Sequence, residues 1–584
     1  MSTGRPIGGV RRAQLITTYG VGSIVAVGSE SFMIAGIDRW PDLRGDERLL
    51  NEPRLQRQLR VDGFRLPPSS DSDSRGDVPV VRFPLYQSCP KCDRLATAKA
   101  FGVKGSPAKC RQCERELVPS RFVMCCTNGH IDDFPYFRWL HHGKSVDRDG
   151  RHDMKVEATG RSAALRSIVI SCSCGERASM EGALGKMALK GVTHCTGKRP
   201  WLGDAAREEC DLVPRAMQRG ASGIWFSEVV SAISIPPWSE GVQKLIAKHW
   251  VTLGNLENET TLREVVDAAK ITRGTPYSRD EVVQAVIKRR LIERGLDEES
   301  EAELKTDEYK ALASTTDERS SKQEFVCVPA PEQEVDPALA IAQVMRVKRL
   351  REVRVLKGFA RLEPPGPASG ATVAGSTLHT EDARPDWLPA MEVIGEGVFL
   401  RLDQKRLTEW ELQDRVIRRV SKIDRFYGRR FTALGRVPDR EITARFMLIH
   451  TLAHAIINQW SLDCGYPAAS LRERLYVSDE MAGVLIYTAT SDSAGSLGGI
   501  VAQVESGDLS TSLHRALDRI SWCSADPLCI ESPPSGVDNL NYAACHACVL
   551  LPETSCEEFN TLLDRALLTG TPQDADVGFY ASMS

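Results

Sequence analysis

Apolar side chains recur at helical spacing in the C-terminal third of the chain. Residues 440–461 carry them on a 3.6-residue period, which predicts a buried helix. Further helices are expected over 404–427, with Arg and Lys on the polar face, and near 506–521. Residues 483–487 form a continuous apolar run typical of a buried strand. This alternation predicts an α/β domain that starts near residue 395.

The pattern is weaker and more varied upstream. Residues 11–40 alternate β-rich runs with glycine turns and predict two or three small strands. Residues 240–325 are expected to be helical and to end in a highly charged segment, a solvated helix face followed by a flexible loop. Residues 335–361 are expected to begin as an amphipathic helix and become basic. Segments rich in Pro, Gly and Ser at 66–79 and 362–387 predict loops.

The fold class predicted from these patterns is a mixed α/β multidomain protein. Small zinc-ribbon-like β modules are expected N-terminally, and a four-cysteine zinc site closes the α/β C-terminal domain. Four parts are expected: a β-rich segment at 1–79, a cysteine-rich zinc-binding region at 80–239, a helical charged region with flexible loops at 240–394, and a zinc-binding domain at 395–584.

Composition narrows the class of partner and compartment. The formal net charge of −3 excludes a polyelectrolyte binder, so a nucleic-acid surface has to be a local basic patch. No apolar run reaches the roughly 18 residues of a membrane helix. The first residues lack the apolar core of a secretion signal, which predicts a cytoplasmic protein without a membrane partner. Seventeen cysteines in a reducing compartment indicate metal ligands rather than disulfides.

Two cysteine sets lie in the N-terminal half. The first consists of two CxxC motifs with seventeen residues between them, and its cysteines are Cys89, Cys92, Cys110 and Cys113. This spacing is typical of a zinc ribbon. The second is looser and predicts a zinc site from Cys172, Cys174, Cys195 and Cys210. Cys125, Cys126 and His130 compete for these positions, although a packed strand end with a hydrogen-bonded histidine is the favoured interpretation of that trio.

The third set lies near the C-terminus and predicts a site from Cys529, Cys545, Cys548 and Cys556. Cys523 is held as a reserve ligand, and His546 is expected to point away from the metal. Two to three structural zinc ions are therefore expected. All-cysteine sites are closed and electron-rich, whereas a catalytic zinc keeps an open position and a nearby general base.

Two segments resemble catalytic motifs but lack a residue that the motif requires. His450 and His454 stand one turn apart, as in the first part of a zincin motif, but Thr451 occupies the position of the general-base Glu. Two hydrogen-bonded histidines in a core helix are favoured over a metal site there. The glycine-rich residues 492–499 lack the Gly-Lys-Ser/Thr ending of a phosphate-binding loop, and a structural turn is expected.

Basic side chains gather in two segments. The first lies within residues 346–361, and the second is interleaved with Phe426 and Tyr427. Cations for phosphates and aromatic rings for base stacking are what single-strand binding uses. A solvated face or an acidic partner explains the same pattern. The predicted nucleic-acid-binding residues are Arg418, Arg419, Lys422, Arg425, Arg429 and Arg430.

Most of the chain resembles a known family. The C-terminal part contains the segments HTLAHAIINQWSLDCGYPAASLRERLY, GVLIYTATSDSAGSLGG, WCSADPLCIE and AACHACVLLPETSCEEFN. In these segments it resembles a helicase-associated domain of unknown function. That domain accompanies superfamily-2 DNA helicases and ends in a four-cysteine zinc site. With RRAQLITTYGVGSIV, FVMCCTNGHIDDFPYFRW, CTGKRPWLG and LREVRVLKGFARLEPP added, the chain resembles the DrmB family of the bacterial DISARM anti-phage system.

The resemblance implies a non-enzymatic subunit that pairs with a separate superfamily-2 helicase, DrmA, in a complex that acts on DNA. It supplies no catalytic residues. The competing hypothesis is a metal-dependent nuclease or other hydrolase that uses His450 and His454.

Overall fold

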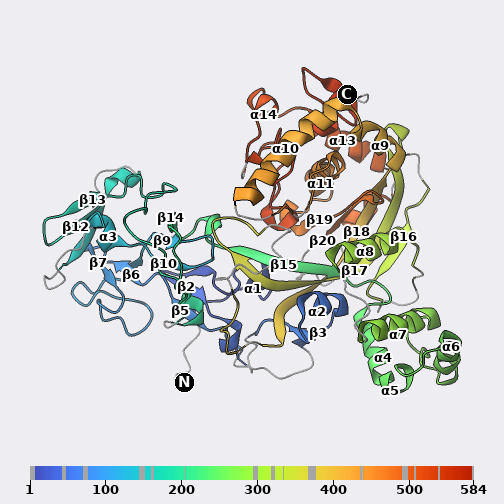
Figure 1. Ribbon diagram of the computed structural model, residues 1–584, viewed down its shortest axis with the longest axis horizontal. Coiled ribbons are helices and arrows are strands. Elements are labelled where there is room, and N and C mark those ends of the chain that lie inside the picture. Colours follow the sequence, from blue (N-terminus) through green and yellow to red (C-terminus); the bar gives the residue numbers. More distant parts are fainter. Residues whose placement is uncertain are drawn as a thin grey trace. The chain divides into compact units, whose positions relative to one another are not determined.

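The protein is described from a computed structural model (Figure 1). It describes residues 7–41, 48–69, 76–143, 152–158, 164–203, 206–293, 300–316, 318, 323–332, 335–365, 377–383, 385–433, 437–438, 440–488, 498–505, 508–536 and 539–581. The fold is mixed α/β with several small sheets. The chain divides into two compact units, residues 1–50, 61–230 and 354–391 in the first and residues 51–60, 231–353 and 392–584 in the second.

The first unit is built mainly from three antiparallel sheets. One has the order β1-β2-β5 (Ile24–Val27, Glu30–Ile34, Val80–Arg82), which confirms small strands within residues 11–40. The second has the order β10-β9-β14 (Ile131–Asp133, Phe122–Cys125, Arg215–Gln218). The third has six strands in the order β13-β12-β11-β7-β6-β8 (Arg177–Ser179, Ile168–Cys172, Met154–Ala158, Arg94–Thr97, Tyr86–Ser88, Val118–Pro119).

Aromatic and aliphatic side chains from two of these sheets share one core. Phe122 and Met124 of β9 pack with Leu95 of β7 and Ile170 of β12, all of them buried. Short helices complete the unit, α1 (Gln14–Thr17) and α3 (Tyr136–Leu140). The strands β3 (Leu49–Leu50) and β4 (Gly63–Arg65) pair with each other. Because the strands are short, the turns between them carry much of the chain, and most cysteines of the unit lie in or beside those turns.

The second unit is organised around strands β19 (Leu471–Val477) and β20 (Ala482–Thr488), which pair antiparallel along their full length. β20 confirms the buried strand predicted at residues 483–487, since six of its residues are buried. On its other side β20 pairs with residues 397–401 of β18 (Trp387–Leu402). β16 (Val326–Pro329) pairs with β17 (Ile341–Ala360). The boundary between the units falls within β15 (Phe226–Ile233), β17 and β18.

Helix α11 (Ala444–Asp463) is the core of the second unit, as its apolar period predicts. It begins where the hydroxyl of Thr443 accepts a hydrogen bond from the amide of Phe446. Fifteen of its residues are buried. Figure 1 shows α11 end-on, with α9, α10 and α13 around it. The surrounding helices are α9 (Gln404–Glu411), α10 (Asp414–Ala433), α12 (Gly499–Ala502), α13 (Leu509–Ser521), α14 (Leu528–Glu531) and α15 (Ala566–Thr569).

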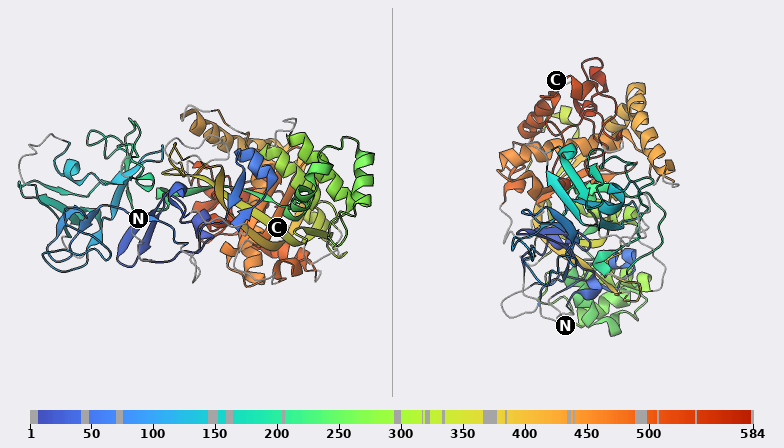
Figure 2. Two further views of the ribbon diagram at one scale, coloured as in Figure 1. Left: turned by 90° about the horizontal axis from the view of Figure 1, so that it is seen from below. Right: turned by 90° about the vertical axis from the view of Figure 1, so that its left-hand side faces the viewer.

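Four helices of the second unit have a small core of their own. Val242, Leu262, Val266 and Val282 are fully buried within it. The green helices stay together in both views of Figure 2. They are α4 (Glu240–Lys248), α5 (Trp250–Leu253), α6 (Glu259–Ala268) and α7 (Arg279–Glu293), and the remaining helices of the unit are α2 (Pro53–Leu59) and α8 (Glu301–Leu312).

One sequence-based expectation is wrong, and another holds only in part. Residues 341–360 form the long strand β17 instead of an amphipathic helix, and its basic residues Arg351 and Arg354 are buried. Helix α8, in the highly charged segment, is not simply a solvated helix. Its Glu308 is fully buried and accepts hydrogen bonds from Arg474 Nε at 2.6 Å and the Tyr476 hydroxyl at 2.9 Å. Buried charges that satisfy one another explain why charge patterning misleads in both places.

Several predicted features lie outside the described residues. These are most of the glycine-rich turn, at 492–497, and parts of the predicted loops at 70–75, 319–322 and 366–376. Among the described residues, no helix combines the length and the apolar character needed to cross a membrane.

Candidate metal centres and a basic helix

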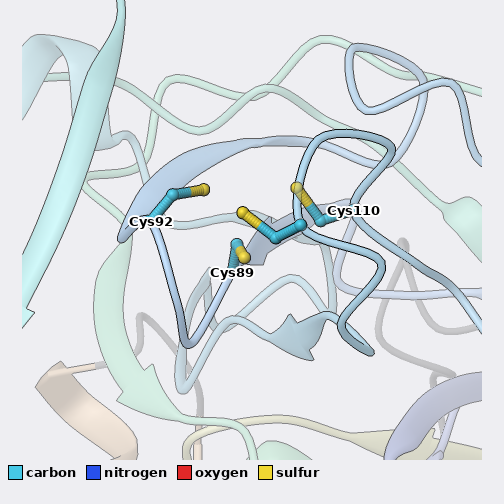
Figure 3. A group of neighbouring side chains, drawn as sticks. Cys89, Cys92 and Cys110 are labelled. Atoms are coloured by element: carbon cyan, nitrogen blue, oxygen red, sulfur yellow. The ribbon is translucent and has the colours of Figure 1, made fainter.

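The first cluster joins the two CxxC segments. Cys89 and Cys92 lie in the turn between β6 and β7, and Cys110 and Cys113 lie in a second turn. The four sulfur atoms lie within 4.8 Å of one another, and those of Cys89, Cys92 and Cys110 face a common point (Figure 3). Each turn ends on a residue with positive φ, Asp93 at 57° and Glu114 at 52°. This chain reversal after the second cysteine directs both thiols of a turn to one side.

The thiols of this cluster differ in their pKa, and only that of Cys89 is lowered. Burial raises the pKa of the Cys89 thiol, but hydrogen bonds from the amides of Lys91 and Cys92 outweigh it and lower the pKa to about 7. Burial and the neighbouring thiols raise the pKa of Cys113 to about 12. Four thiols in this arrangement match the tetrahedral four-sulfur donor set of a structural zinc site.

A second cluster is built on the hairpin from β9 to β10. Cys126 and His130 flank its turn, and His130 Nδ1 lies 3.4 Å from Cys126 Sγ and 3.6 Å from Cys195 Sγ. Cys210 completes the group, whose four donor atoms lie within 4.8 Å of one another. The other ring nitrogen of His130 bonds to the carboxylate of Glu208. A carboxylate in this position orients a metal-ligating imidazole, because it fixes the tautomer and the ring angle.

A third cluster surrounds the turn from β12 to β13. Cys172 and Cys174 lie with His141, at the end of α3, and His152, which precedes β11. Nε2 of His141 lies 3.4 Å from Cys174 Sγ, and Nδ1 of His152 lies 3.2 Å from Cys172 Sγ. The Nδ1 of His141 bonds to the carbonyl oxygen of Phe137 at 2.8 Å, which leaves Nε2 for the cluster. A hydrogen bond from the amide of Glu176 and another from His141 lower the pKa of Cys174 to about 6.

The structure thus divides the predicted second set between two clusters. Cys172 and Cys174 lie in one of them, and Cys195 and Cys210 lie in the other. The trio expected as a packed strand end is split as well, because Cys126 and His130 join a cluster while the adjacent Cys125 stays in β9. Sequence reasoning missed His141 and His152. Neither lies near a cysteine in the sequence, so only the tertiary fold brings them in.

The fourth cluster is C-terminal. Cys523 Sγ lies 3.5 Å from Cys545 Sγ, and Cys529 Sγ lies 3.8 Å from Cys548 Sγ. The fourth sulfur is therefore that of Cys523, the predicted reserve, and not that of Cys556. Burial raises the pKa of Cys529 to about 11. His546 is exposed and stands outside the cluster.

Cys556 belongs to a fifth cluster, with His450, His454 and Glu473. All four residues are buried, and the two imidazoles come from successive turns of α11. The expected hydrogen bonding of the histidines holds in part. Nδ1 of His454 bonds to the carbonyl oxygen of Val549, whereas Nδ1 of His450 has no hydrogen-bond partner among the described residues. The described residues therefore hold five candidate clusters, where the sequence predicts two to three zinc ions.

The predicted nucleic-acid-binding residues lie on α10 and do not share one environment. Arg419 turns inward and forms two hydrogen bonds to the carboxylate of Asp564, at 2.5 and 3.0 Å. Tyr427 is buried against Phe431, so the expectation that it is available for stacking is wrong. Nothing is described of the side chain of Arg430. The exposed cations of the helix, called the basic face below, are Arg418, Lys422, Arg425 and Arg429.

Comparison with known proteins identifies the family. Residues 11–226 match a domain of unknown function, DUF8724, and residues 452–549 match the MrfA Zn-binding domain. The chain is 31% identical over 570 residues to the DISARM protein DrmB of Bacillus paralicheniformis, covering 93% of this chain and 97% of that protein. The chain belongs to the DrmB family.

The clusters of this DrmB family member fall into different matched regions. The first three lie within the DUF8724 match, and Cys523, Cys529, Cys545 and Cys548 lie within the MrfA Zn-binding match. Together the match and the clusters support zinc binding by this chain. The fifth cluster is different, because His450 precedes the MrfA Zn-binding match and Cys556 follows it.

Proposed function

We propose that this protein is a non-catalytic subunit that binds a superfamily-2 DNA helicase of the DrmA kind and helps it to engage DNA in anti-phage defence. The observation that carries the proposal is the 31% identity to the DISARM protein DrmB across almost the whole of both chains. Identity over that length supports a shared role better than a match to one domain does.

The cysteine-containing clusters support the structural part of the proposal. We propose that zinc is held by the first four clusters, with Cys89, Cys92, Cys110 and Cys113 in one and the C-terminal cysteines in another. Each cluster offers four protein donors, so no coordination position is left for a substrate. Ions of that kind stabilise turns that carry little apolar surface of their own.

The basic face of α10 supports contact with DNA. Arg418, Lys422, Arg425 and Arg429 are spaced by four, three and four residues, which places them along one side of the helix. In the described part of the chain, none of the four forms an ion pair with a carboxylate. A row of cations without acidic partners suits a phosphate backbone, since each neutralised phosphate releases counterions.

The experiment replaces Arg418, Lys422 and Arg425 together with alanine. Binding to the co-expressed helicase is measured by size-exclusion chromatography, and DNA affinity of the complex is measured over a salt series. We expect an intact complex, weaker DNA binding for all sequences, and a salt slope reduced by roughly one unit per lost phosphate contact. Arg419 is left unchanged because its ion pair with the buried Asp564 is structural.

A matched control removes the same charge elsewhere in the second unit. Lys248, Lys270 and Arg273 are exposed, and they lie at the end of α4 and between α6 and α7, helices that Figure 1 shows apart from α10. Their triple alanine variant should leave both measurements unchanged. If the α10 variant dissociates from the helicase, the basic face is the partner interface and the DNA role is wrong. If neither measurement changes, the face is only solvated, and the DNA role is again wrong.

The hydrolase hypothesis finds less support. His450 and His454 are fully buried, and the hydroxyl of Thr451 donates to the carbonyl of Met447 at 2.6 Å instead of facing a substrate. A hydrolytic metal needs an open position that water and substrate reach. Nuclease activity of the purified protein that disappears in His454→Ala would reverse this choice.

A further inference from the structure

Four potential ligands meet in the core of the second unit. Nε2 of His450 lies 3.1 Å from Glu473 Oε1 and 3.2 Å from Cys556 Sγ. Nε2 of His454 lies 3.5 Å from the same carboxylate oxygen. The imidazoles come from α11, the carboxylate comes from β19, and the thiol comes from the segment after the C-terminal cysteines. Three separate parts of the chain thus direct a nitrogen, oxygen or sulfur atom at one point.

Burial makes the charge of this cluster hard to explain without a cation. The side chains of His450, His454 and Glu473 have no exposed surface, and Cys556 is 4% exposed. A fully buried carboxylate has to be matched by positive charge. Within the part of the chain that the structure describes, the second carboxylate oxygen of Glu473 and Nε2 of His454 have no hydrogen-bond partner.

Outer contacts orient the atoms as metal ligands. Nδ1 of His454 lies 3.0 Å from the carbonyl oxygen of Val549 and has to donate its proton there. The lone pair of the ring is therefore on Nε2, which faces the cluster, and this is the usual outer contact of a metal-ligating histidine. Backbone amides of Glu558 and Asn560 each lie 3.3 Å from Cys556 Sγ. Two amide donors stabilise a thiolate, the form of cysteine that binds metal.

We propose that His450, His454, Glu473 and Cys556 bind one divalent transition-metal ion, for which zinc fits best. Two neutral imidazoles, one carboxylate and one thiolate carry a charge of −2 together, which a divalent ion neutralises. A thiolate excludes the hard cations Mg²⁺ and Ca²⁺, and mixed N, O and S donors suit zinc. Four protein donors in a buried site make the ion structural.

The site is separate from the C-terminal cysteine cluster and differs from it in chemistry. That cluster offers four sulfur atoms, whereas this one offers a single sulfur atom. The inference is also independent of the helicase and DNA proposal, since it concerns only the core of the chain. A metal here would join α11, β19 and the segment around Cys556, and would add to the ion pair between Arg474 of β19 and Glu557.

The test uses native mass spectrometry to compare the zinc content of four full-length proteins, which are the wild type and the variants Glu473→Gln, Cys556→Ala and Cys464→Ala. Glu473→Gln keeps the side-chain volume and removes the charge, and Cys556→Ala removes the sulfur. Each variant should lose one metal ion relative to the wild type and keep the others. Cys464→Ala is the matched control, because Cys464 lies outside every cluster of the described residues and should retain the full content. Unchanged metal content in both cluster variants would overturn the proposal.

Wild-type crystals provide a readout that does not depend on variants that fold. Anomalous scattering at the zinc edge should give a peak between the four donor atoms, about 2.0–2.3 Å from each. Peaks at the cysteine clusters with none between His450 and Cys556 would instead show a metal-free core. That result would also overturn the proposal.

Discussion

The guanidinium group of Arg361 donates a hydrogen bond through Nε to the carbonyl oxygen of Gly129, at 2.8 Å, across 232 residues of sequence. Gly129 lies in the turn between Cys126 and His130. The other nitrogens of Arg361 donate to the carbonyls of Ile224 at 2.7 Å and Gly22 at 2.8 Å. The side chain is fully buried, and burial lowers its pKa to about 10. A buried cation therefore fixes the hairpin that carries half of one metal cluster.

Replacing Arg361 with methionine should destabilise the first unit by about 3 kcal/mol, because three buried carbonyls lose their donor. Hydrogen exchange of the amides in β9 measures this as a lower free energy of opening. Arg177→Met is the control, since Arg177 is 60% exposed and pairs only loosely with Glu157. Equal protection in the two variants would contradict the role given to Arg361.

Adjacent cysteines in the first unit should behave differently. Cys126→Ala removes a member of the cluster with His130, Cys195 and Cys210, and one zinc ion per chain should be lost. Cys125→Ala should keep every zinc ion, because its thiol belongs to no cluster of the described residues. Metal analysis of the two purified variants makes the comparison. Loss of zinc from both, or from neither, would mean that the cluster is wrongly assigned.

The buried ion pair between Glu308 and Arg474 should stabilise the second unit. Glu308→Gln removes the nearer of the two carboxylates that pair with the buried guanidinium and leaves only Glu557, at 3.6 Å. We expect this to lower the free energy of unfolding by about 3 kcal/mol. Glu301 is exposed on the same helix, so Glu301→Gln should change it by less than about 0.5 kcal/mol. Denaturant unfolding of the two variants distinguishes them. A small effect at Glu308 would show that α8 docks mainly through Leu304 and Leu312.

Neighbouring arginines on α10 should separate stability from binding. Arg419→Ala leaves the fully buried carboxylate of Asp564 unpaired and should cost about 3 kcal/mol. Arg418→Ala removes an exposed cation and should leave the melting temperature unchanged while it weakens DNA binding by the helicase complex. Thermal melts and DNA titrations of both variants test the distinction. A stable Arg419→Ala variant would mean that Asp564 finds another partner or is protonated.

How much of this could be predicted depends on how far apart the interacting residues lie in the sequence. Cys89 and Cys92 are three residues apart, and local spacing alone predicts that their thiols face one ion. The apolar period of α11 likewise predicts its burial. Both predictions depend only on residues that are close in the sequence, so they need no knowledge of the tertiary fold.

Long-range pairs leave no such signal. Glu473 carries a charge that by itself predicts exposure, yet it is fully buried because His450 and His454 lie opposite. Arg351 reads as part of a basic helix, but its Nε donates to Glu392 at 2.8 Å from within β17. Polar residues that satisfy one another in a core have the same sequence pattern as exposed ones. Only the fold tells them apart.

The contact between His450 and Cys556 spans 106 residues, and this has a consequence for the unfolded chain. If the proposed metal ion still links His450 and Cys556 when the chain unfolds, it closes a loop that includes β19, β20, α13 and the cysteines Cys523, Cys529, Cys545 and Cys548. In the chain-entropy model, a cross-link that closes a loop of about 100 residues raises the free energy of the unfolded state by roughly 4.7 kcal/mol. A link between the two cysteines of one CxxC turn closes a much shorter loop and has a smaller effect. During synthesis the loop stays open until the ribosome has added Cys556, so a nascent chain that stops earlier leaves His450, His454 and Glu473 without their last partner.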